Sequence, residues 1–229
     1  MEKTTVRLQG KIAVIFGAGG DVGSAIARAF AEQGAIVFLS GRSISNVARV
    51  AENIENAGGV AHVEDVDALD EHVVNSYLDK VAAEAGRIDI VFNAVGPQAK
   101  DYNNGTNTME LPIEKFMLPL NTIVSSQFIT SRSAARYMKQ QRSGVIILIS
   151  SIPAKGHAPN VAAIGAAFGA VESLVRCLAA DFGPSGVRVT GLRTAGMTDT
   201  RTIEQTFENV GKAMGIPAKQ VVSVMEQKT

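Results

Sequence analysis

The residues with the clearest chemical potential form a glycine-rich turn directly after the apolar run 12–16. An amphipathic segment follows the turn, so the turn should join a buried strand to a helix. The first N–H groups of a helix have no acceptors within it, and the helix dipole favours an anion beside them. The spacing therefore predicts a site for the pyrophosphate of a dinucleotide, although a tight turn without a ligand remains the alternative. The candidate contacts are Gly17, Gly19, Gly20, Asp21, Val22 and Gly23.

The segment after the next apolar run bears on which dinucleotide would bind. It reads Ser40-Gly41-Arg42-Ser43, with Gly41 where an NAD site would carry an acidic residue for the ribose 2′-hydroxyl. A guanidinium such as that of Arg42 suits a 2′-phosphate better. We therefore favour NADP(H) over NAD(H), with a solvated loop arginine as the alternative. Asp65 and Val66, after the third run, are candidates to border the adenine.

The elements that must position these residues are short apolar runs separated by amphipathic segments. Their nearly continuous Val and Ile content is typical of parallel strands buried on both faces. The alternation predicts an α/β fold: a doubly wound parallel sheet with helices on both sides, Rossmann-like and three-layered, in a single domain over residues 1–229. The predicted strands are 12–16, 36–39, 60–63, 88–92, 145–149 and 187–192.

Composition excludes several other classes of function. Lys and Arg number 22 and Asp and Glu number 22, so the formal net charge is zero and neither nucleic acid nor a membrane surface is an expected partner. No run approaches the roughly 18 apolar residues needed to span a bilayer, and we expect a cytoplasmic protein.

The single cysteine, Cys177, is expected to be a buried thiol. The histidines lack metal-ligand spacing, so no metal site is expected.

From about residue 10 to residue 200 the chain resembles the short-chain dehydrogenase/reductase family. The glycine turn is similar to that family's Gly-x-x-x-Gly-x-Gly, with Asp21 replacing the middle glycine. Asn93-Ala94-Val95-Gly96 resembles its Asn-Asn-Ala-Gly, which lines the cofactor cleft and adds Asn93, Ala94 and Gly96 to the candidate cofactor contacts. Asn121 matches the family's helix asparagine, and Ser151 matches its catalytic serine. The resemblance implies an NAD(P)-dependent oxidoreductase acting on a small carbonyl or alcohol, assembled as a homodimer or homotetramer.

The departures from the family pattern fall at the positions that, by the resemblance, would surround the reacting nicotinamide and substrate. The family places a tyrosine 13 residues after the serine and a lysine four residues later, whereas this chain has Ile164 and Phe168 there. Neither side chain exchanges a proton. Both belong to an apolar stripe of helical period, which predicts that they pack against the core or another subunit. The family's Pro-Gly after the sixth strand appears as Thr194-Ala195.

Other side chains could supply the missing acid. Tyr102 lies in the irregular segment 97–112, which we expect to be a substrate loop together with the region after residue 195, and His157 follows Ser151. Ser151 and Asn121 remain able to polarise a carbonyl. Tyr77 and Tyr137 are expected to have surface roles on helices.

Three functions stay open at this point. The first is an oxidoreductase with non-standard catalytic residues, and the second is a catalytically silent NADP(H)-binding sensor or regulatory subunit. The third, an isomerase or hydratase that uses a bound nucleotide only structurally, has no supporting residue. The family's last parallel strand is not found before Thr229, so either the chain is truncated or the sheet ends after six strands.

Overall fold

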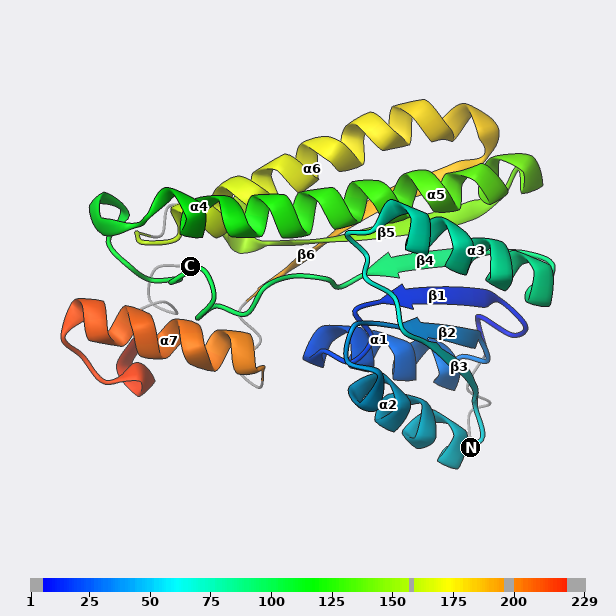
Figure 1. Ribbon diagram of the computed structural model, residues 1–229, viewed down its shortest axis with the longest axis horizontal. Helices are drawn as coiled ribbons and strands as arrows, with labels where there is room; N and C mark the ends of the chain where they lie inside the picture. Colours follow the sequence, from blue (N-terminus) through cyan, green and yellow to red (C-terminus); the bar gives the residue numbers. More distant parts are fainter. Residues whose placement is uncertain (1–5, 157–158, 196–199, 222–229) are drawn as a thin grey trace. The chain divides into compact units, whose positions relative to one another are not determined.

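The computed structural model describes residues 6–156, 159–195 and 200–221, and within them six strands form one sheet in the order β3-β2-β1-β4-β5-β6 (Figure 1). Each pairing between β3, β2, β1, β4 and β5 is parallel. The predicted fold class is confirmed, and the six predicted strands are found with their ends shifted by at most two residues. The strands are β1 Ile12–Phe16, β2 Ile36–Ser40, β3 Val60–Glu64, β4 Ile90–Asn93, β5 Gly144–Ser151 and β6 Val187–Thr194.

Helices alternate with the strands along the chain, as a doubly wound sheet requires. A π-helical turn, Leu120–Val124, separates the fourth helix from the fifth, and it contains Asn121, the position that matches the family's helix asparagine. The helices are α1 Asp21–Glu32, α2 Ile44–Asn56, α3 Glu71–Ala85, α4 Ile113–Pro119, α5 Ser125–Gln141, α6 Ala162–Phe182 and α7 Arg201–Met214.

The chain divides into two compact units. The first unit comprises Met1–Val95, Ser126–Ile149 and Leu174–Gly191, and therefore contains the glycine turn and most of the sheet. The second unit comprises Gly96–Ser125, Ser150–Ser173 and Leu192–Thr229, and therefore contains Ser151, Asn121 and both predicted substrate loops. Each unit is described by itself below.

The core of the first unit lies on both faces of the sheet. Alternate residues of a strand point to opposite faces, so Ala13 and Ile15 of β1 face the α1 and α2 side, where they cluster with Val47 and Ile54 of α2. Phe16 points the other way and meets the Tyr77 ring of α3 edge-on, with centroids 5.8 Å apart. Both faces of β1 are thus buried, which explains its unbroken apolar sequence.

A buried carboxylate fixes the start of the central strands. Asp89, only 6% exposed, accepts hydrogen bonds from the Ile12 N–H at 3.0 Å and from Arg87 at 2.6 and 2.9 Å. Lys11 lies 3.5 Å away. Burial by itself would raise the pKa of Asp89, but the Arg87 and Ile12 hydrogen bonds and the two nearby cations outweigh it and lower the pKa.

The predicted substrate loop 97–112 is tied to α7 in the second unit. The buried Asn104 donates through Nδ2 to the Thr206 Oγ1 at 3.0 Å, and Asn209 donates back to the Asn104 carbonyl oxygen at 2.9 Å. Gly105 has φ +92°, and a Cβ there would lie 3.0 Å from the Asn209 Cβ. The loop is therefore packed through its backbone against a helix about a hundred residues later in the sequence.

Helix α6 differs from two sequence predictions. By length and composition alone, Ala162–Ser185 is apolar enough to cross a membrane, so the expectation that no run approaches that length is wrong for this segment. Its Glu172 pairs with Arg193 of β6 at 2.6 Å, a contact typical of a helix that packs on a sheet. Cys177 is exposed on this helix and is not the buried thiol that the sequence predicted.

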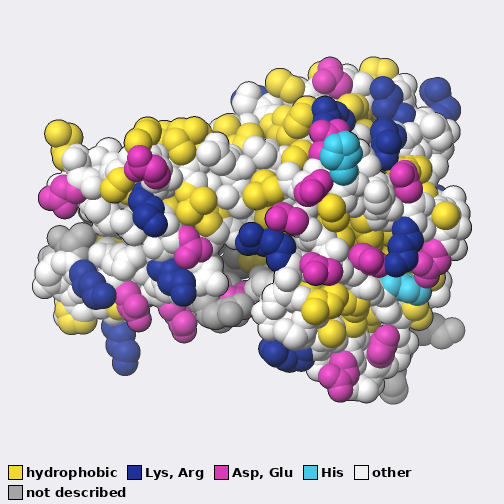
Figure 2. All heavy atoms as spheres, in the orientation of Figure 1, with side chains coloured by type: hydrophobic (Ala, Val, Ile, Leu, Met, Phe, Trp, Pro, Cys, Tyr) yellow, Lys and Arg dark blue, Asp and Glu magenta, His cyan; other side chains and the backbone are white. Residues whose placement is uncertain are grey.

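Charges of both signs are interspersed over the surface shown in Figure 2. This distribution agrees with the formal net charge of zero.

Candidate functional site

The glycine turn lies between β1 and α1, as predicted. Gly17 has φ +73°, in the left-handed region that favours glycine. A Cβ on Gly23 would fall 2.2 Å from the Gly17 carbonyl oxygen, so glycine is required there by the turn itself. A Cβ on Gly20 would meet only that same oxygen, at an ordinary 3.4 Å. The packing of the chain therefore requires glycine at position 23. At position 20 it does not, and a glycine there would be needed only if a ligand lay close to the backbone.

The backbone N–H groups at the start of α1 form a potential anion site. Its N-cap is Gly20, which is extended and provides no side-chain capping hydrogen bond, and the helix begins at Asp21. The N–H groups of Asp21, Val22 and Gly23 belong to the first turn and have no acceptor inside the helix. A pyrophosphate fits this arrangement, because the donors and the positive end of the helix dipole lie together.

Neighbouring strand ends surround the glycine turn in the first unit. The Ala18 N–H donates to the Ser40 carbonyl oxygen at 3.0 Å, which holds the turn against the end of β2. A Cβ on Gly19 would lie 3.0 Å from the Asn46 Cβ of α2. Arg42 is exposed just after β2. Beyond β3, Asp65 is exposed whereas Val66 is 2% exposed.

Asn93 has a structural role at the end of β4. It is buried, donates through Nδ2 to the Thr130 Oγ1 of α5 at 3.0 Å, and accepts from the Val95 N–H at 2.8 Å. The Ala94 N–H donates to the Phe16 carbonyl oxygen at 2.9 Å, and the Ala94 backbone closes against Gly17. Asn93 and Ala94 therefore fix the end of β4 next to the glycine turn. Gly96 begins the second unit and is exposed.

In the second unit, Ser151 ends β5 and is hydrogen-bonded to β6. Its Oγ donates to the Thr194 carbonyl oxygen at 3.1 Å, and the Thr194 Oγ1 donates to the Ser150 carbonyl oxygen at 3.1 Å. Thr194 stands where the family pattern has proline, whose side chain has no hydroxyl to make the second bond. The hydroxyl hydrogen of Ser151 is thus engaged, and its lone pairs are the part that can meet a substrate.

A polar cluster beside Ser151 was missed by the sequence analysis. Ser150, 1% exposed, donates to the Glu172 Oε1 at 3.1 Å, and the Arg193 Nε donates to the same oxygen at 2.6 Å. The Arg193 hydrogen bond is the main cause that lowers the pKa of Glu172. A glutamate inside the apolar stripe of α6 was the signal that could have revealed this cluster.

Asn121 lies in the π-helical turn between α4 and α5 and is exposed. Pro119 at the end of α4 has no N–H to donate, which favours a change of helical geometry at this point. π-helical turns occur frequently at functional sites. The structure therefore presents Asn121 on an irregular and accessible turn.

The two positions that replace the family's tyrosine and lysine lie on α6. Ile164 is buried, 8% exposed, which confirms that it packs, and Phe168 is half-buried. Val171 and Leu178 continue the buried stripe at 0% and 4% exposure.

The structure describes only one of the two candidate replacements for the missing acid, Tyr102 and His157. Tyr102 is 2% exposed, and burial raises the pKa of its phenol, so it is not placed to exchange protons with a solvent-accessible substrate. His157 lies outside the described residues. Tyr77 is buried between α3 and the sheet, so the surface role expected for it is wrong.

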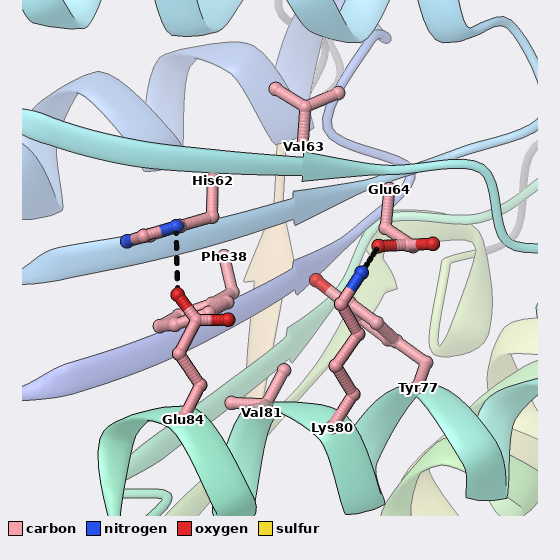
Figure 3. A pocket seen from close by; sticks show the side chains of 8 residues that line it. All are labelled: Phe38, His62, Val63, Glu64, Tyr77, Lys80, Val81 and Glu84. Carbon is pink, nitrogen blue, oxygen red and sulfur yellow. Dashed lines mark hydrogen bonds and ion pairs between the residues drawn. The ribbon is translucent and has the colours of Figure 1, made fainter.

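A pocket of about 120 Å³ lies between β2, β3 and α3 in the first unit (Figure 3). His62 stacks on Phe38 with centroids 4.4 Å apart and reaches Glu84 at 3.1 Å, while Lys80 pairs with Glu64. The Tyr77 side chain also lines this pocket. None of the candidate cofactor or catalytic residues is among its lining side chains.

Comparison with known proteins gives a consistent assignment. The family model for short chain dehydrogenases matches residues 11–211. The chain is 30% identical over 187 residues to the 7α-hydroxysteroid dehydrogenase of Escherichia coli, covering 82% of this chain and 71% of that protein. It is 32% identical over 195 residues to a hydroxynaphthalene reductase of Aspergillus fumigatus, covering 85% and 69%.

Solved structures agree with this assignment. NAD⁺-bound xylitol dehydrogenase superposes with a TM-score of 0.83 at 26% identity, covering 90% of this chain and 78% of that one. A 7α-hydroxysteroid dehydrogenase complexed with NADH and 7-oxo glycochenodeoxycholic acid has a TM-score of 0.76 at 29% identity, covering 89% and 80%. This chain therefore belongs to the short-chain dehydrogenase family, whose members are oxidoreductases that bind NAD(H) or NADP(H).

Proposed function

We propose that this chain binds NADP(H) in preference to NAD(H) and oxidises or reduces a small alcohol or carbonyl compound with non-standard catalytic residues. The observation that carries the nucleotide part is the uncapped amino terminus of α1, which follows the glycine turn and has Gly20 where the chain's own packing does not require glycine. A pyrophosphate satisfies the donors at this position.

The preference for NADP(H) rests on Arg42. An exposed guanidinium after β2 pairs with a phosphate through charge-assisted hydrogen bonds, and Gly41 leaves no carboxylate there for a ribose hydroxyl. The two related structures described above carry NAD⁺ and NADH, so the preference is argued from this residue alone.

Catalysis would depend on a small number of polar groups beside the substrate. When bound, the nicotinamide supplies the capacity for hydride transfer. Ser151 offers its oxygen lone pairs to a substrate hydroxyl, and Asn121 offers an exposed amide. His157 is the better of the two substitute acids, because Tyr102 is buried. A missing general acid costs about 10² to 10⁴ in rate, so turnover should be slow if no donor replaces it.

A second candidate function is a catalytically silent NADP(H)-binding sensor or regulatory subunit. It is favoured by Ile164 and Phe168, which contribute to an apolar stripe on α6 and cannot exchange protons. We further propose assembly as a homodimer or homotetramer, since α6 carries exposed and half-buried small residues that allow close helix approach, as in Gly165, Ala166, Gly169 and Ala170.

The experiment that tests the proposal is a thermal-shift titration with NADPH, NADP⁺, NADH and NAD⁺. A ligand at about 100 times its Kd adds about 2.7 kcal/mol to the free energy of unfolding, which moves the Tm by several degrees. We expect the larger shift with the phosphorylated pair. Absence of a shift with all four would overturn the proposed function.

Protein that passes this test is then mixed with NADPH and a panel of ketones and enones, and absorbance of NADPH is followed. Consumption that depends on the carbonyl compound supports the oxidoreductase. Binding without consumption supports the silent sensor.

A further inference from the structure

The pocket between β2, β3 and α3 has an aromatic wall that the proposed function does not use (Figure 3). Phe38 and His62 are paired in register on neighbouring strands, and their rings stack with centroids 4.4 Å apart. The volume is about 120 Å³, and every lining residue belongs to the first unit. An apolar cavity of about 150 Å³ accommodates benzene, so this pocket has room for a group of a few heavy atoms.

The hydroxyl group of Tyr77 is a buried polar group that lines this pocket. The residue is 5% exposed, and among the residues that the structure describes its hydroxyl oxygen has no hydrogen-bond partner. The nearby Ser40 hydroxyl donates instead to the Ile15 carbonyl oxygen at 3.4 Å. Figure 3 shows the Tyr77 side chain running from α3 toward the strands, with its oxygen between two ion pairs. A buried polar group without a partner costs free energy, so this hydroxyl is available to a molecule that enters the pocket.

Two carboxylates act on the same space. Glu84 reaches the His62 Nδ1 at 3.1 Å, and Glu64 pairs with Lys80. Burial is the main cause that raises the pKa of Tyr77, and the charges of both glutamates raise it further. The hydrogen bond from Glu64 is the main cause that raises the pKa of Lys80, and the charge of Glu84 adds to it. Both glutamates therefore favour a positive charge in this pocket.

A guanidinium group has the properties that this lining would recognise. It is planar, stacks on aromatic rings and presents N–H donors in a geometry that matches carboxylates. The oxygen of a tyrosine hydroxyl also accepts hydrogen bonds. The ammonium of Lys80 is a more compact charge on a flexible stem, and its side chain is 60% exposed. A cation that fits the pocket better can therefore displace Lys80 from Glu64.

We propose that this pocket binds a small free organic cation of the guanidinium class, held by Glu64, Glu84 and the Tyr77 hydroxyl, with Lys80 as a competitor for the same carboxylates. The inference goes beyond the proposed function, because the lining contains none of the candidate nucleotide or catalytic residues. It predicts that the Tyr77 hydroxyl destabilises the free protein and strengthens cation binding.

The test titrates the full chain, without nucleotide, with methylguanidinium, and follows the ring protons of His62 by NMR. His72, an exposed residue in the first turn of α3, provides reference ring signals that should not move. For so small a ligand we expect a Kd of about 1 to 10 mM. Methylurea has the same planar shape without the charge, and should bind at least about tenfold more weakly.

Tyr77→Phe removes only the hydroxyl group. We expect the Kd for methylguanidinium to rise about tenfold, and the Tm without ligand to rise by about 2 to 4 °C because the unpaired buried group is gone. A merely structural hydroxyl would give a lower Tm instead. Tyr137→Phe is the matched control, since the Tyr137 hydroxyl donates to Asp79 and Tyr137 does not line the pocket. It should bind methylguanidinium as wild type does.

The charged residues give effects of opposite sign. Glu84→Gln should raise the Kd about tenfold, whereas Lys80→Met should lower it about threefold because the competing ammonium is removed. Absence of binding to wild type, or equal binding of methylurea, would overturn the inference. An unchanged Kd in both Tyr77→Phe and Glu84→Gln would show that the cation binds elsewhere, and would overturn it as well.

A short capped peptide with one arginine distinguishes the two sources of a guanidinium. Weaker binding of the peptide than of methylguanidinium supports a free cation, whereas tighter binding would assign the pocket to an arginine of a protein partner and overturn the proposal. The proposed function is tested separately by the dinucleotide titration. Failure of either titration leaves the other result standing, because the two use different residues.

Discussion

The Oγ of Ser151 donates a hydrogen bond of 3.1 Å to the carbonyl oxygen of Thr194, the last residue of β6. Thr194 also donates a hydrogen bond, from its Oγ1 to the Ser150 carbonyl oxygen at 3.1 Å. The ends of β5 and β6 are thus joined by two bonds that both involve Thr194. Thr194, which replaces the proline of the family pattern, therefore helps to hold the candidate serine Ser151 in place.

Thr194→Val removes one of these bonds and keeps the shape and the main-chain carbonyl. The loss of this half-buried hydroxyl and of its hydrogen bond to the Ser150 carbonyl oxygen should lower the free energy of unfolding by about 1 kcal/mol. Urea unfolding measures this. Thr190→Val, an exposed threonine on the same strand, is the control and should change little. An equal loss in both variants would show that the Thr194 hydroxyl bond contributes nothing specific.

The carboxylate of Asp89 makes the first unit sensitive to acid. Its pKa is lower in the folded protein than in the unfolded chain, so its contribution is present above the unfolded pKa of about 4 and is lost as the pH falls through the folded value. Asp89→Asn should therefore unfold about 2 kcal/mol more easily than wild type at pH 7, with the difference shrinking below about pH 4.

Urea unfolding at pH 7, 5 and 3 measures this prediction. Glu52→Gln, which removes an exposed carboxylate from α2, should follow wild type at every pH. A difference between Asp89→Asn and wild type that stays constant down to pH 3 would contradict the ionic explanation.

The strands and the glycine turn were predictable because their signals are local. An unbroken apolar run of five residues such as 12–16 is buried on both faces wherever it falls in a parallel sheet. The surface role expected for Tyr77 was wrong although the sequence carries a signal for its burial, since Val74, Tyr77, Leu78 and Val81 recur at helical spacing and all four are buried.

Other features depend on contacts that sequence spacing does not encode. Asn104 and Thr206 are 102 residues apart, and only the folded chain reveals that they tie a loop to α7. Cys177 lies in a helix that is apolar on most sides, where periodicity does not separate a buried position from an exposed one. The Ser150, Glu172 and Arg193 cluster likewise joins two strands and a helix.

Gly23 and Gly20 should respond differently to a methyl group. In Gly23→Ala the new Cβ would lie 2.2 Å from the Gly17 carbonyl oxygen, so the turn must distort and the Tm should fall by several degrees. In Gly20→Ala the nearest atom is 3.4 Å away, so the Tm should change little. If a pyrophosphate lies against this backbone, Gly20→Ala should nevertheless bind NADPH at least about tenfold more weakly. Unchanged affinity in Gly20→Ala would argue against a nucleotide at the turn.

Arg42 should decide between the two dinucleotides. Arg42→Ala removes the guanidinium proposed to hold the 2′-phosphate, and a charge-assisted hydrogen bond is worth about 1.5 to 3 kcal/mol, so Kd for NADPH should rise by about tenfold to a hundredfold. NADH lacks that phosphate, and its affinity should stay the same. Isothermal calorimetry with both nucleotides measures the ratio, and Arg28→Ala, which removes an exposed arginine from α1, controls for net charge. A loss shared equally by NADPH and NADH would mean that Arg42 acts through general electrostatics, and the choice of NADP(H) would then lose its only structural support.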